Sequence, residues 1–290
     1  MTTDLYSKLL HALTQVGRYE PSATAMFDFS RERTLRSVDE SLQRLGVDYI
    51  DTVQVHDPEF APSLDVVLRE TLPALEELRA SGKIRCIGIT GYPLSALREL
   101  AARAPAAGVR VDTAVTYCRF NMFCKDLVTS GTLAELRKAG IAVINAAPLA
   151  MGLLTTRGPP SWHPALPALK ARCAAAASAA TAMQLDVSRL ALAFCLDASS
   201  QEGIATTLVS MGSVAEVKAN VGAANGTLAL TAVERSALAT LQTQFFSAPV
   251  PSAVPGAPDA PFQSIATWEG VEVDNYWAKL GASTSSASWV

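Results

Sequence analysis

Short apolar segments alternate along the chain with longer stretches in which apolar residues recur every three or four positions. The short segments are four to seven residues long, a length typical of buried strands in a parallel sheet. We expect strands at residues 13–16, 49–55, 84–89, 112–117, 141–146 and 205–210. The regular exchange of strand and helix patterns predicts an α/β fold with parallel strands.

The helical stretches carry recognisable start and stop signals. Ser30 can cap a helix in which Leu35, Val38 and Leu42 share one face, and Gly46 ends that helix. Further helices are predicted at residues 68–78 with an end at Gly82, from Pro93 as first helical residue, at 133–138 and across the alanine-rich residues 168–197.

The number of strands limits the choice of architecture. Six strands are too few to close a β/α barrel, which needs eight. We interpret residues 1–245 as an incomplete TIM-type (β/α)8 barrel domain that lacks about the first two β/α units. An open doubly wound sheet of six strands is the alternative. Residues 246–290 are rich in Pro, Ala and Ser without apolar periodicity, so we expect a mostly flexible tail.

Composition narrows the classes of function. The 290 residues carry a net charge of -3 and no run of Lys or Arg, which argues against a nucleic-acid partner. The sequence has no apolar stretch of the ~18 residues that a membrane span needs, and no signal-peptide pattern at its start. Its five cysteines are scattered without a C-x-x-C motif, so we expect a reducing compartment, a cytoplasmic protein and no metal site.

One histidine stands where parallel α/β folds place their chemistry. His56 closes an apolar segment and precedes the turn Asp57-Pro58-Glu59. Catalytic groups in such folds lie beyond the carboxyl ends of the strands, so His56 is a candidate for handling a proton. The alternative is a strand-end histidine that bonds to the turn that follows it.

Residues 208–221 form the strongest local signal. Ser213 can cap a helix, and Glu216 three residues later completes a capping box. A helix N-terminus presents free N–H groups and a positive dipole end, which favour phosphate. The loops after the last two strands of a β/α barrel often hold phosphate. An ordinary capped helix would have the same sequence pattern.

Residues 144–164 follow a strand and contain many small residues, so they can shape a binding loop, although an ordinary surface loop would look similar. The other two histidines are interpreted as surface or packing residues, because His11 lies in a short amphipathic stretch and His163 in a proline-rich loop.

Four segments together resemble the aldo-keto reductases, and among them the L-galactose dehydrogenases of plants and algae. The resemblance covers roughly residues 13–245. It rests on the stretches GRYEPSATAMFDFSRER (17–33), SVDESLQRLGVDYIDTVQVHDPEF (37–60), GKIRCIGITGYPL (82–94) and APLAMGLLTTRGPPSWHP (147–164). The end of the last stretch, GPPSWHP, is the most specific to the L-galactose dehydrogenase group.

The resemblance implies a β/α barrel that holds a nicotinamide cofactor and moves a hydride between it and a sugar. In the L-galactose group, NAD oxidises C1 of the sugar to a lactone on the route to ascorbate. His56 then matches the family histidine that orients the substrate oxygen. The implied cofactor contacts are Thr90 at the nicotinamide, Pro148, Leu149, Gly152 and Leu153 at the pyrophosphate, and Ser210, Gly212, Ser213, Glu216 and Asn220 around the adenosine. Because Glu216 would repel the 2'-phosphate of NADP, NAD is the expected cofactor.

The sequence also departs from the family pattern. The family Asp and Tyr belong to the first two β/α units, which this sequence lacks, and Gln15 stands where the catalytic Lys is expected. An uncharged amide cannot lower a tyrosine pKa as an ammonium does. Tyr19 and Tyr117 lie near rim positions but are interpreted as packing residues.

Two interpretations of these departures remain open. One is an enzyme whose N-terminal units are missing from this sequence. The other is a catalytically degenerate reductase that acts as a nucleotide-binding or structural subunit. In either case, open sheet edges favour a protein partner or self-association.

Overall fold

The computed structural model describes residues 14–16, 27–226 and 229–248. The strands in these ranges follow one another through the sheet in chain order, from β1 to β6. They are β1 (Thr14–Val16), β2 (Ile50–His56), β3 (Ile84–Gly91), β4 (Thr113–Tyr117), β5 (Ala142–Ala146) and β6 (Thr206–Leu208). The β1–β2, β2–β3 and β5–β6 pairs are parallel. All six expected strands are therefore present, and the predicted fold class, a TIM-type β/α topology with fewer than eight strands, is confirmed in the described residues.

The chain divides into two compact units. Among the described residues, unit 1 comprises residues 14–16, 27–115 and 134–143, and unit 2 comprises residues 116–133, 144–226 and 229–248. The division passes through β4 and β5. Most of the predicted tail, residues 249–290, lies outside the described residues, so its flexibility stays a prediction.

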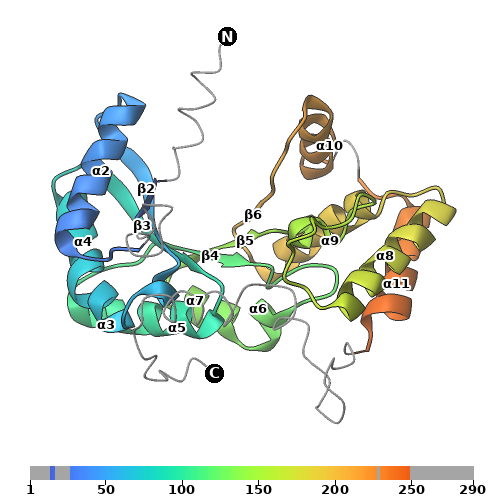
Figure 1. The fold of residues 1–290 in the computed structure, drawn as a ribbon, viewed down its shortest axis with the longest axis horizontal. Helices are drawn as coiled ribbons and strands as arrows, with labels where there is room; N and C mark the ends of the chain where they lie inside the picture. Colours follow the sequence, from blue (N-terminus) through green and yellow to red (C-terminus); the bar gives the residue numbers. More distant parts are fainter. Residues whose placement is uncertain (1–13, 17–26, 227–228, 249–290) are drawn as a thin grey trace. The chain divides into compact units, whose positions relative to one another are not determined.

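In unit 1, helices α2 (Arg31–Leu45) and α4 (Leu72–Ala80) pack together and lie side by side in Figure 1. The α2 start is as predicted, because the Ser30 side chain accepts a hydrogen bond from Arg33 N. Its end is also as predicted, since Gly46 takes the left-handed conformation (φ 66°) that glycine adopts without strain. Helix α5 (Leu94–Arg103) packs on β3 in the same unit.

The helix expected at residues 68–78 is longer and interrupted. It begins as α3 (Leu64–Val66), widens into a π-helical turn (Val67–Thr71) and continues as α4. The cause is Pro73, whose ring would clash with the carbonyl of residue 69 and which has no N–H to donate. A widened turn accommodates both effects. Pro93, expected as the first helical residue, instead has extended backbone (φ -73°, ψ 120°) and caps α5.

In unit 2, the alanine-rich stretch forms two helices rather than one. Helix α8 (Pro167–Ala182) ends before a turn in which Gln184 has a positive φ of 59°. Asp186 then caps α9 (Val187–Glu202) by accepting a hydrogen bond from Ser188 N. Helix α11 (Ala232–Phe246), which was not predicted, packs on α8 (Figure 1). Its start is a complete capping box formed by Thr231 and Glu234.

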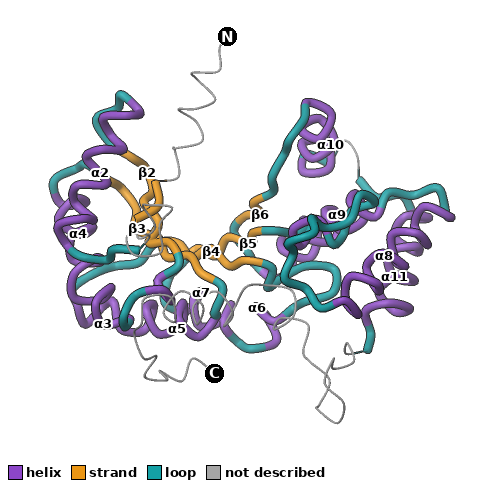
Figure 2. Tube along the Cα trace, in the orientation of Figure 1, coloured by secondary structure: helices purple, strands orange, loops and turns teal. Residues whose placement is uncertain are grey.

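Short elements complete the described fold, whose helices, strands and loops are coloured separately in Figure 2. They are a 3-10 turn at Pro58–Phe60, a 3-10 turn at Ala104–Ala107, α6 (Asp126–Thr129), α7 (Thr132–Lys138), a 3-10 turn at Ala150–Gly152, and the longer α10 (Val214–Ala224). Within the described ranges, no single helix is long and apolar enough to cross a membrane; α8 and α9 reach that length and composition only together, across a bend of 103°.

The cysteines are distributed unevenly between the units. Cys118, Cys124, Cys173 and Cys195 are buried in the apolar core of unit 2. Burial raises the pKa of all four thiols, to about 12 for Cys118 and Cys173 and higher for the other two. Cys86 lies on β3 in unit 1 and is half-buried. No disulfide joins any of the five.

Candidate functional site

His56 and Thr90 end neighbouring strands side by side. The register of β2 and β3 pairs His56 with Thr90, and the backbone N–H of Asp57 donates to Thr90 O at 2.8 Å. Both side chains are half-buried, so each can be reached from solvent. Alternation along β2 explains their direction: Val53 and Val55 are fully buried on the opposite face. The two predicted residues of unit 1 are therefore brought together at the carboxyl end of parallel strands.

The imidazole of His56 is flanked by a carboxylate. Its Nδ1 lies 3.0 Å from Asp57 Oδ2, close enough for an ion pair when the ring is protonated. The approach does not have the direction of a hydrogen bond, and Nδ1 has no other partner among the described residues. The negative charge favours a proton on Nδ1, which leaves Nε2 with its lone pair. The ring can then accept a proton or a hydrogen bond at Nε2.

A second carboxylate, which the sequence indicated only as part of an acidic turn, lies beside this pair. Glu59 is buried, with 5% of its surface exposed, and its Oε1 accepts a hydrogen bond from Tyr92 N at 3.0 Å. A Cβ at Gly91 would lie 2.5 Å from Glu59 Oε2, so only glycine fits the end of β3. The absence of a side chain at residue 91 is thus explained by the buried acid.

Polar groups that the sequence reading missed lie within the strands. Gln54 is 3% exposed and donates from Nε2 to Thr113 Oγ1 at 2.9 Å. In unit 2, Asn145 is fully buried and donates from Nδ2 to Phe120 O at 2.9 Å. Buried oxygens of three residues have no hydrogen-bond partner among the described residues: Gln54 Oε1, Thr116 Oγ1 and Asn145 Oδ1. Since buried polar atoms are normally paired, each of these oxygens, taken by itself, can accept a hydrogen bond from a ligand or from water.

Tyr117, at the end of β4, does not have the properties of an activated phenol. Burial raises its pKa above the ordinary value of 10.0. No cation contributes to a lowering of that pKa, so the phenol stays protonated at neutral pH. This agrees with its interpretation as a packing residue. Tyr19 lies outside the described residues.

The predicted pyrophosphate loop is a compact turn after β5. Leu153 is 1% exposed and belongs to the apolar core of unit 2, and Pro148 is also buried. Leu149 and Gly152 are half-buried. Because its side chain is buried, Leu153 could contact a ligand only through its backbone. Gly152 has φ 95°, a conformation that suits glycine alone.

The predicted adenosine segment is exposed and already carries an anion. Ser210, Gly212, Ser213 and Glu216 are exposed, and Asn220 is half-buried. Ser213 Oγ accepts from Glu216 N at 3.2 Å, as expected for the cap of α10. The Glu216 carboxylate, however, accepts from Gly212 N at 2.5 Å rather than from Ser213 N. The capping box predicted here is therefore incomplete, and Glu216 supplies a negative charge where a phosphate would otherwise bind.

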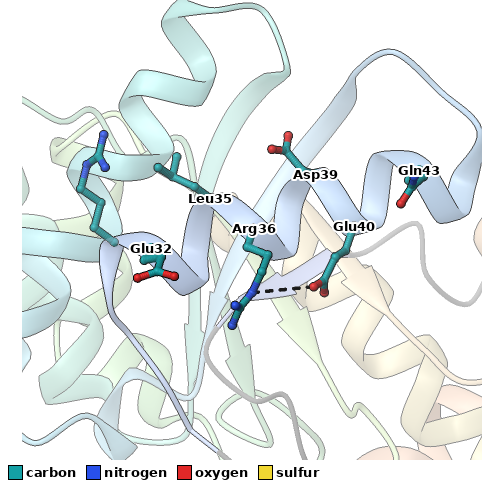
Figure 3. Close-up of a pocket in the computed structure, with 7 residues that line it drawn as sticks. Glu32, Leu35, Arg36, Asp39, Glu40 and Gln43 are labelled. Atoms are coloured by element: carbon teal, nitrogen blue, oxygen red, sulfur yellow. Dashed lines mark ion pairs between the residues drawn. The ribbon is translucent and has the colours of Figure 1, made fainter.

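His11 lies outside the described residues, whereas His163 is buried and packs inside unit 2. Figure 3 shows a shallow groove whose lining residues all belong to α2: Arg31, Glu32, Leu35, Arg36, Asp39, Glu40 and Gln43. Arg36 and Glu40 form an exposed ion pair at 3.8 Å, so this groove is a solvated helix face. In the described residues, no three His, Cys, Asp or Glu side chains gather as metal ligands.

Comparison with known proteins gives consistent matches. Residues 8–238 match the model of the Aldo/keto reductase family. L-galactose dehydrogenase of Arabidopsis thaliana is 43% identical over 210 residues, covering 72% of this chain and 62% of that protein. D-arabinose 1-dehydrogenase of Saccharomyces cerevisiae is 29% identical over 209 residues, covering 71% of this chain and 60% of that protein.

Solved structures agree with the sequence matches. The aldo-keto reductase AKR11C1 from Bacillus halodurans, in its holo form, superposes with a TM-score of 0.60 at 28% identity, covering 78% of this chain and 71% of that one. The glycerol dehydrogenase AKR11B4 from Gluconobacter oxydans, at 20% identity and a TM-score of 0.59, supports the fold alone. The chain spans about three fifths of the length of the two curated relatives.

Proposed function

Because the chain belongs to the aldo/keto reductase family, we propose that it is part of a NAD-dependent sugar dehydrogenase of the L-galactose dehydrogenase type, which needs the family's N-terminal β/α units for turnover. The substrate on this proposal is a small sugar such as L-galactose, oxidised at C1 to its lactone. The observation that carries the proposal is the pairing of His56 with Thr90 at the ends of neighbouring parallel strands. The reaction would belong to the cytoplasmic route to ascorbate.

The chemistry divides between the cofactor and the protein side chains. When bound, the nicotinamide ring accepts the hydride from C1. Thr90 would contact the carboxamide, and His56 would hold the substrate oxygen through Nε2. Asp57 supports this by keeping a proton on Nδ1, so that the ring has a single orientation toward the sugar. The loop of Pro148, Leu149, Gly152 and Leu153 would follow the pyrophosphate.

The charge near α10 favours NAD over NADP. Ser210, Gly212, Ser213 and Asn220 would surround the adenosine part. The Glu216 carboxylate is bound to Gly212 N, so it is fixed at the start of the helix. A 2'-phosphate at this position would meet that negative charge at short range. A ribose 2'-hydroxyl would instead find a hydrogen-bond acceptor.

A second candidate is a nucleotide-binding subunit without turnover. It is favoured by Gln15, which lies on β1 opposite Gln54 in the strand register, at the place where the resemblance puts a lysine. Oxidation of a hydroxyl requires a group that removes its proton. In the described residues this role would fall to His56, next to the carboxylate of Asp57.

The experiment compares two proteins. One is the 290-residue chain, and the other is a chimaera that adds the first two β/α units of the Arabidopsis L-galactose dehydrogenase and carries Gln15→Lys. NADH binding is followed by fluorescence, and turnover by absorbance with NAD and L-galactose. We expect both proteins to bind NADH, and only the chimaera to oxidise the sugar. His56→Asn in the chimaera should lower kcat/KM by about 100-fold, as expected for loss of a substrate-orienting group.

The outcomes separate the two candidates. NADH binding by both proteins with an inactive chimaera would favour the non-catalytic subunit. Failure of both proteins to bind NADH would overturn the dehydrogenase proposal and the subunit proposal together. Turnover by the 290-residue chain would show that the Asp, Tyr and Lys of the family are not needed here.

A further inference from the structure

The loop after β5 has a strained backbone over a very short distance. Ala147, Ala150 and Met151 have φ values of 58°, 48° and 52°, all in the left-handed region that residues with a Cβ disfavour. Gly152 follows with φ 95°. Such a run of left-handed residues persists only where the surroundings hold it in place.

Residues 157–164 supply part of this support. A Cβ at Gly152 would lie 3.0 Å from Gly158 O and 3.2 Å from the Cα of Pro159, so the two backbones touch at that point. The second contact is polar. His163 Nε2 lies 3.1 Å from Ala150 O. The two loops are therefore packed together at two nearby positions, Ala150 and Gly152.

Both ring nitrogens of His163 are engaged. Nδ1 accepts a hydrogen bond from Ala165 N at 3.0 Å, so this nitrogen carries no proton. Nε2 must then carry the proton that it donates to Ala150 O. The hydrogen-bond network thus assigns a single neutral tautomer. With 3% of its surface exposed, the ring cannot exchange these partners for water.

The backbone of His163 is itself fixed. Its N–H donates to Pro160 O at 3.0 Å, and its carbonyl accepts from Lys170 Nζ at 2.7 Å. Lys170 belongs to α8, so the ring is anchored to a helix of sixteen residues. A rigid support of this kind lets one side chain determine the shape of a neighbouring loop.

We propose that His163 is a positioning residue, whose neutral imidazole holds the carbonyl of Ala150 and so fixes residues 148–153 in the shape that receives the cofactor pyrophosphate. The second half of this statement rests on the proposed function. The first half concerns the protein alone. His163 touches neither substrate nor cofactor in this arrangement, and it acts only through Ala150.

The neutral state of the ring adds a physical consequence. Burial lowers the pKa of His163, and Lys170 adds to the effect. The folded protein therefore binds this proton less readily than the unfolded chain does. A further proton would go on Nδ1, where it would meet the N–H of Ala165 that this nitrogen accepts from. The stability that the neutral ring contributes is therefore fully present above the ordinary histidine pKa of 6.5 and is lost as pH falls through the lowered pKa.

The test compares His163→Leu with His163→Gln. Leucine keeps the apolar bulk but loses both hydrogen bonds, whereas glutamine can still donate to Ala150 O and does not titrate. Trp162→Leu is the matched control, because Trp162 lies in the same loop with 60% of its surface exposed. Amide hydrogen exchange is measured for residues 147–153 and for α9. Affinities are measured for NADH, which includes the pyrophosphate, and for AMP, which lacks it.

We expect His163→Leu to speed exchange in residues 147–153 but not in α9. The affinity for NADH should fall by about ten-fold, the effect of losing one buried hydrogen bond, and the affinity for AMP should fall by much less. In His163→Gln, the exchange of residues 147–153 and the affinity for NADH should both stay close to wild type. Trp162→Leu should change neither the exchange nor the affinity. If His163→Leu does not fold, the exchange of residues 147–153 in His163→Gln and wild type is compared at about pH 5.5 and 7.5, and only wild type should loosen at the lower pH.

Several results would overturn the proposal. Unchanged exchange at residues 147–153 in His163→Leu, or equal exchange losses in α9, would mean that His163 has a general packing role. An equal fall in the affinities for NADH and AMP would reject the assignment of residues 148–153 to the cofactor pyrophosphate. If wild type binds no NADH, the proposed function fails, while the exchange result still decides whether His163 holds the loop.

Discussion

The side-chain amide of Gln54 lies directly against the backbone of Gly88. The two residues are paired in the register of β2 and β3, and a Cβ at Gly88 would lie 2.1 Å from Gln54 Oε1. Gln54 is held there by its hydrogen bond to Thr113 Oγ1 on β4. A polar side chain thus crosses β3 because glycine leaves room for it.

This relationship predicts the cost of adding one methyl group. Gly88→Ala should lower the free energy of unfolding by about 1–3 kcal/mol, because Gln54 must leave its buried position and its bond to Thr113. The same substitution in a Gln54→Ala background should cost at least about 1 kcal/mol less. Urea unfolding of the four proteins of this cycle measures both values. Additive effects would show that the contact does not couple the two strands.

A second prediction concerns acid stability of unit 2. Glu234 is 9% exposed, and its pKa is lowered to about 2, first by the hydrogen bond from Arg189 and then by the backbone N–H of Thr231. The folded state thus binds the proton less readily than the unfolded state. The stabilisation is present above about pH 4.5 and is lost as pH falls toward about 2.

The measurement is the unfolding free energy of wild type and Glu234→Gln across this range of pH. The difference should be constant above about pH 5 and should shrink below about pH 4.5. Glu135→Gln is the control, because the Glu135 pair with Arg98 is exposed and should contribute little. A difference that does not vary with pH would assign the effect to packing rather than charge.

A third prediction concerns cofactor choice. Glu216→Gln should raise the affinity for NADPH by about ten-fold relative to NADH, because the charge that faces the 2'-phosphate is removed. The Gly212 N–H also becomes available, since the amide is a weaker acceptor. Asp197→Asn, which removes the same charge from the exposed face of α9, should leave the ratio unchanged. Equal gains in both variants would point to net charge instead of position.

A fourth prediction concerns association. β6 ends the strand order, and α10, the next helix, exposes Val214, Val217 and Val221 at spacings of three and four residues. These spacings put the three valines on one helix face. We expect the chain to form dimers through this apolar surface with a second copy. Val217→Lys together with Val221→Lys should weaken the dimer by at least about ten-fold in sedimentation, since each buried valine is worth about 1.5 kcal/mol or more. A monomer at all concentrations would reject this interface.

The sequence alone predicted the strands well because their apolar runs are short and bounded by glycine. It could not predict the break between α8 and α9, since residues 183–186 contain neither Gly nor Pro. The π-helical turn before Pro73 was missed because a proline near a helix start also suits an ordinary first turn. By contrast, the capping box at Thr231 and Glu234 is legible in the sequence, so α11 could have been found.

In the candidate site, too, some residues could be predicted from the sequence and others could not. His56 was identifiable because its position at a strand end is a local property. The fit of Gln54 over Gly88, and the bond from Asn145 to Phe120 O, join residues that are distant in the chain. Such partners depend on strand register, which one sequence does not specify. The hydrogen bonds of His163 depend on the conformation of two loops, which the sequence does not specify, although GPPSWHP was already the most specific stretch.

The separation of the cysteines has a practical consequence. A thiol reagent attacks the thiolate, and four thiols are both sealed in the core of unit 2 and shifted far above neutral pH. Modification of these four at neutral pH therefore requires unit 2 to open. Cys86 in unit 1 is half-buried, so its alkylation does not require opening and supplies an internal reference. Mass spectrometry of a timed alkylation can thus record the opening rate of unit 2 in one untagged, unmutated sample.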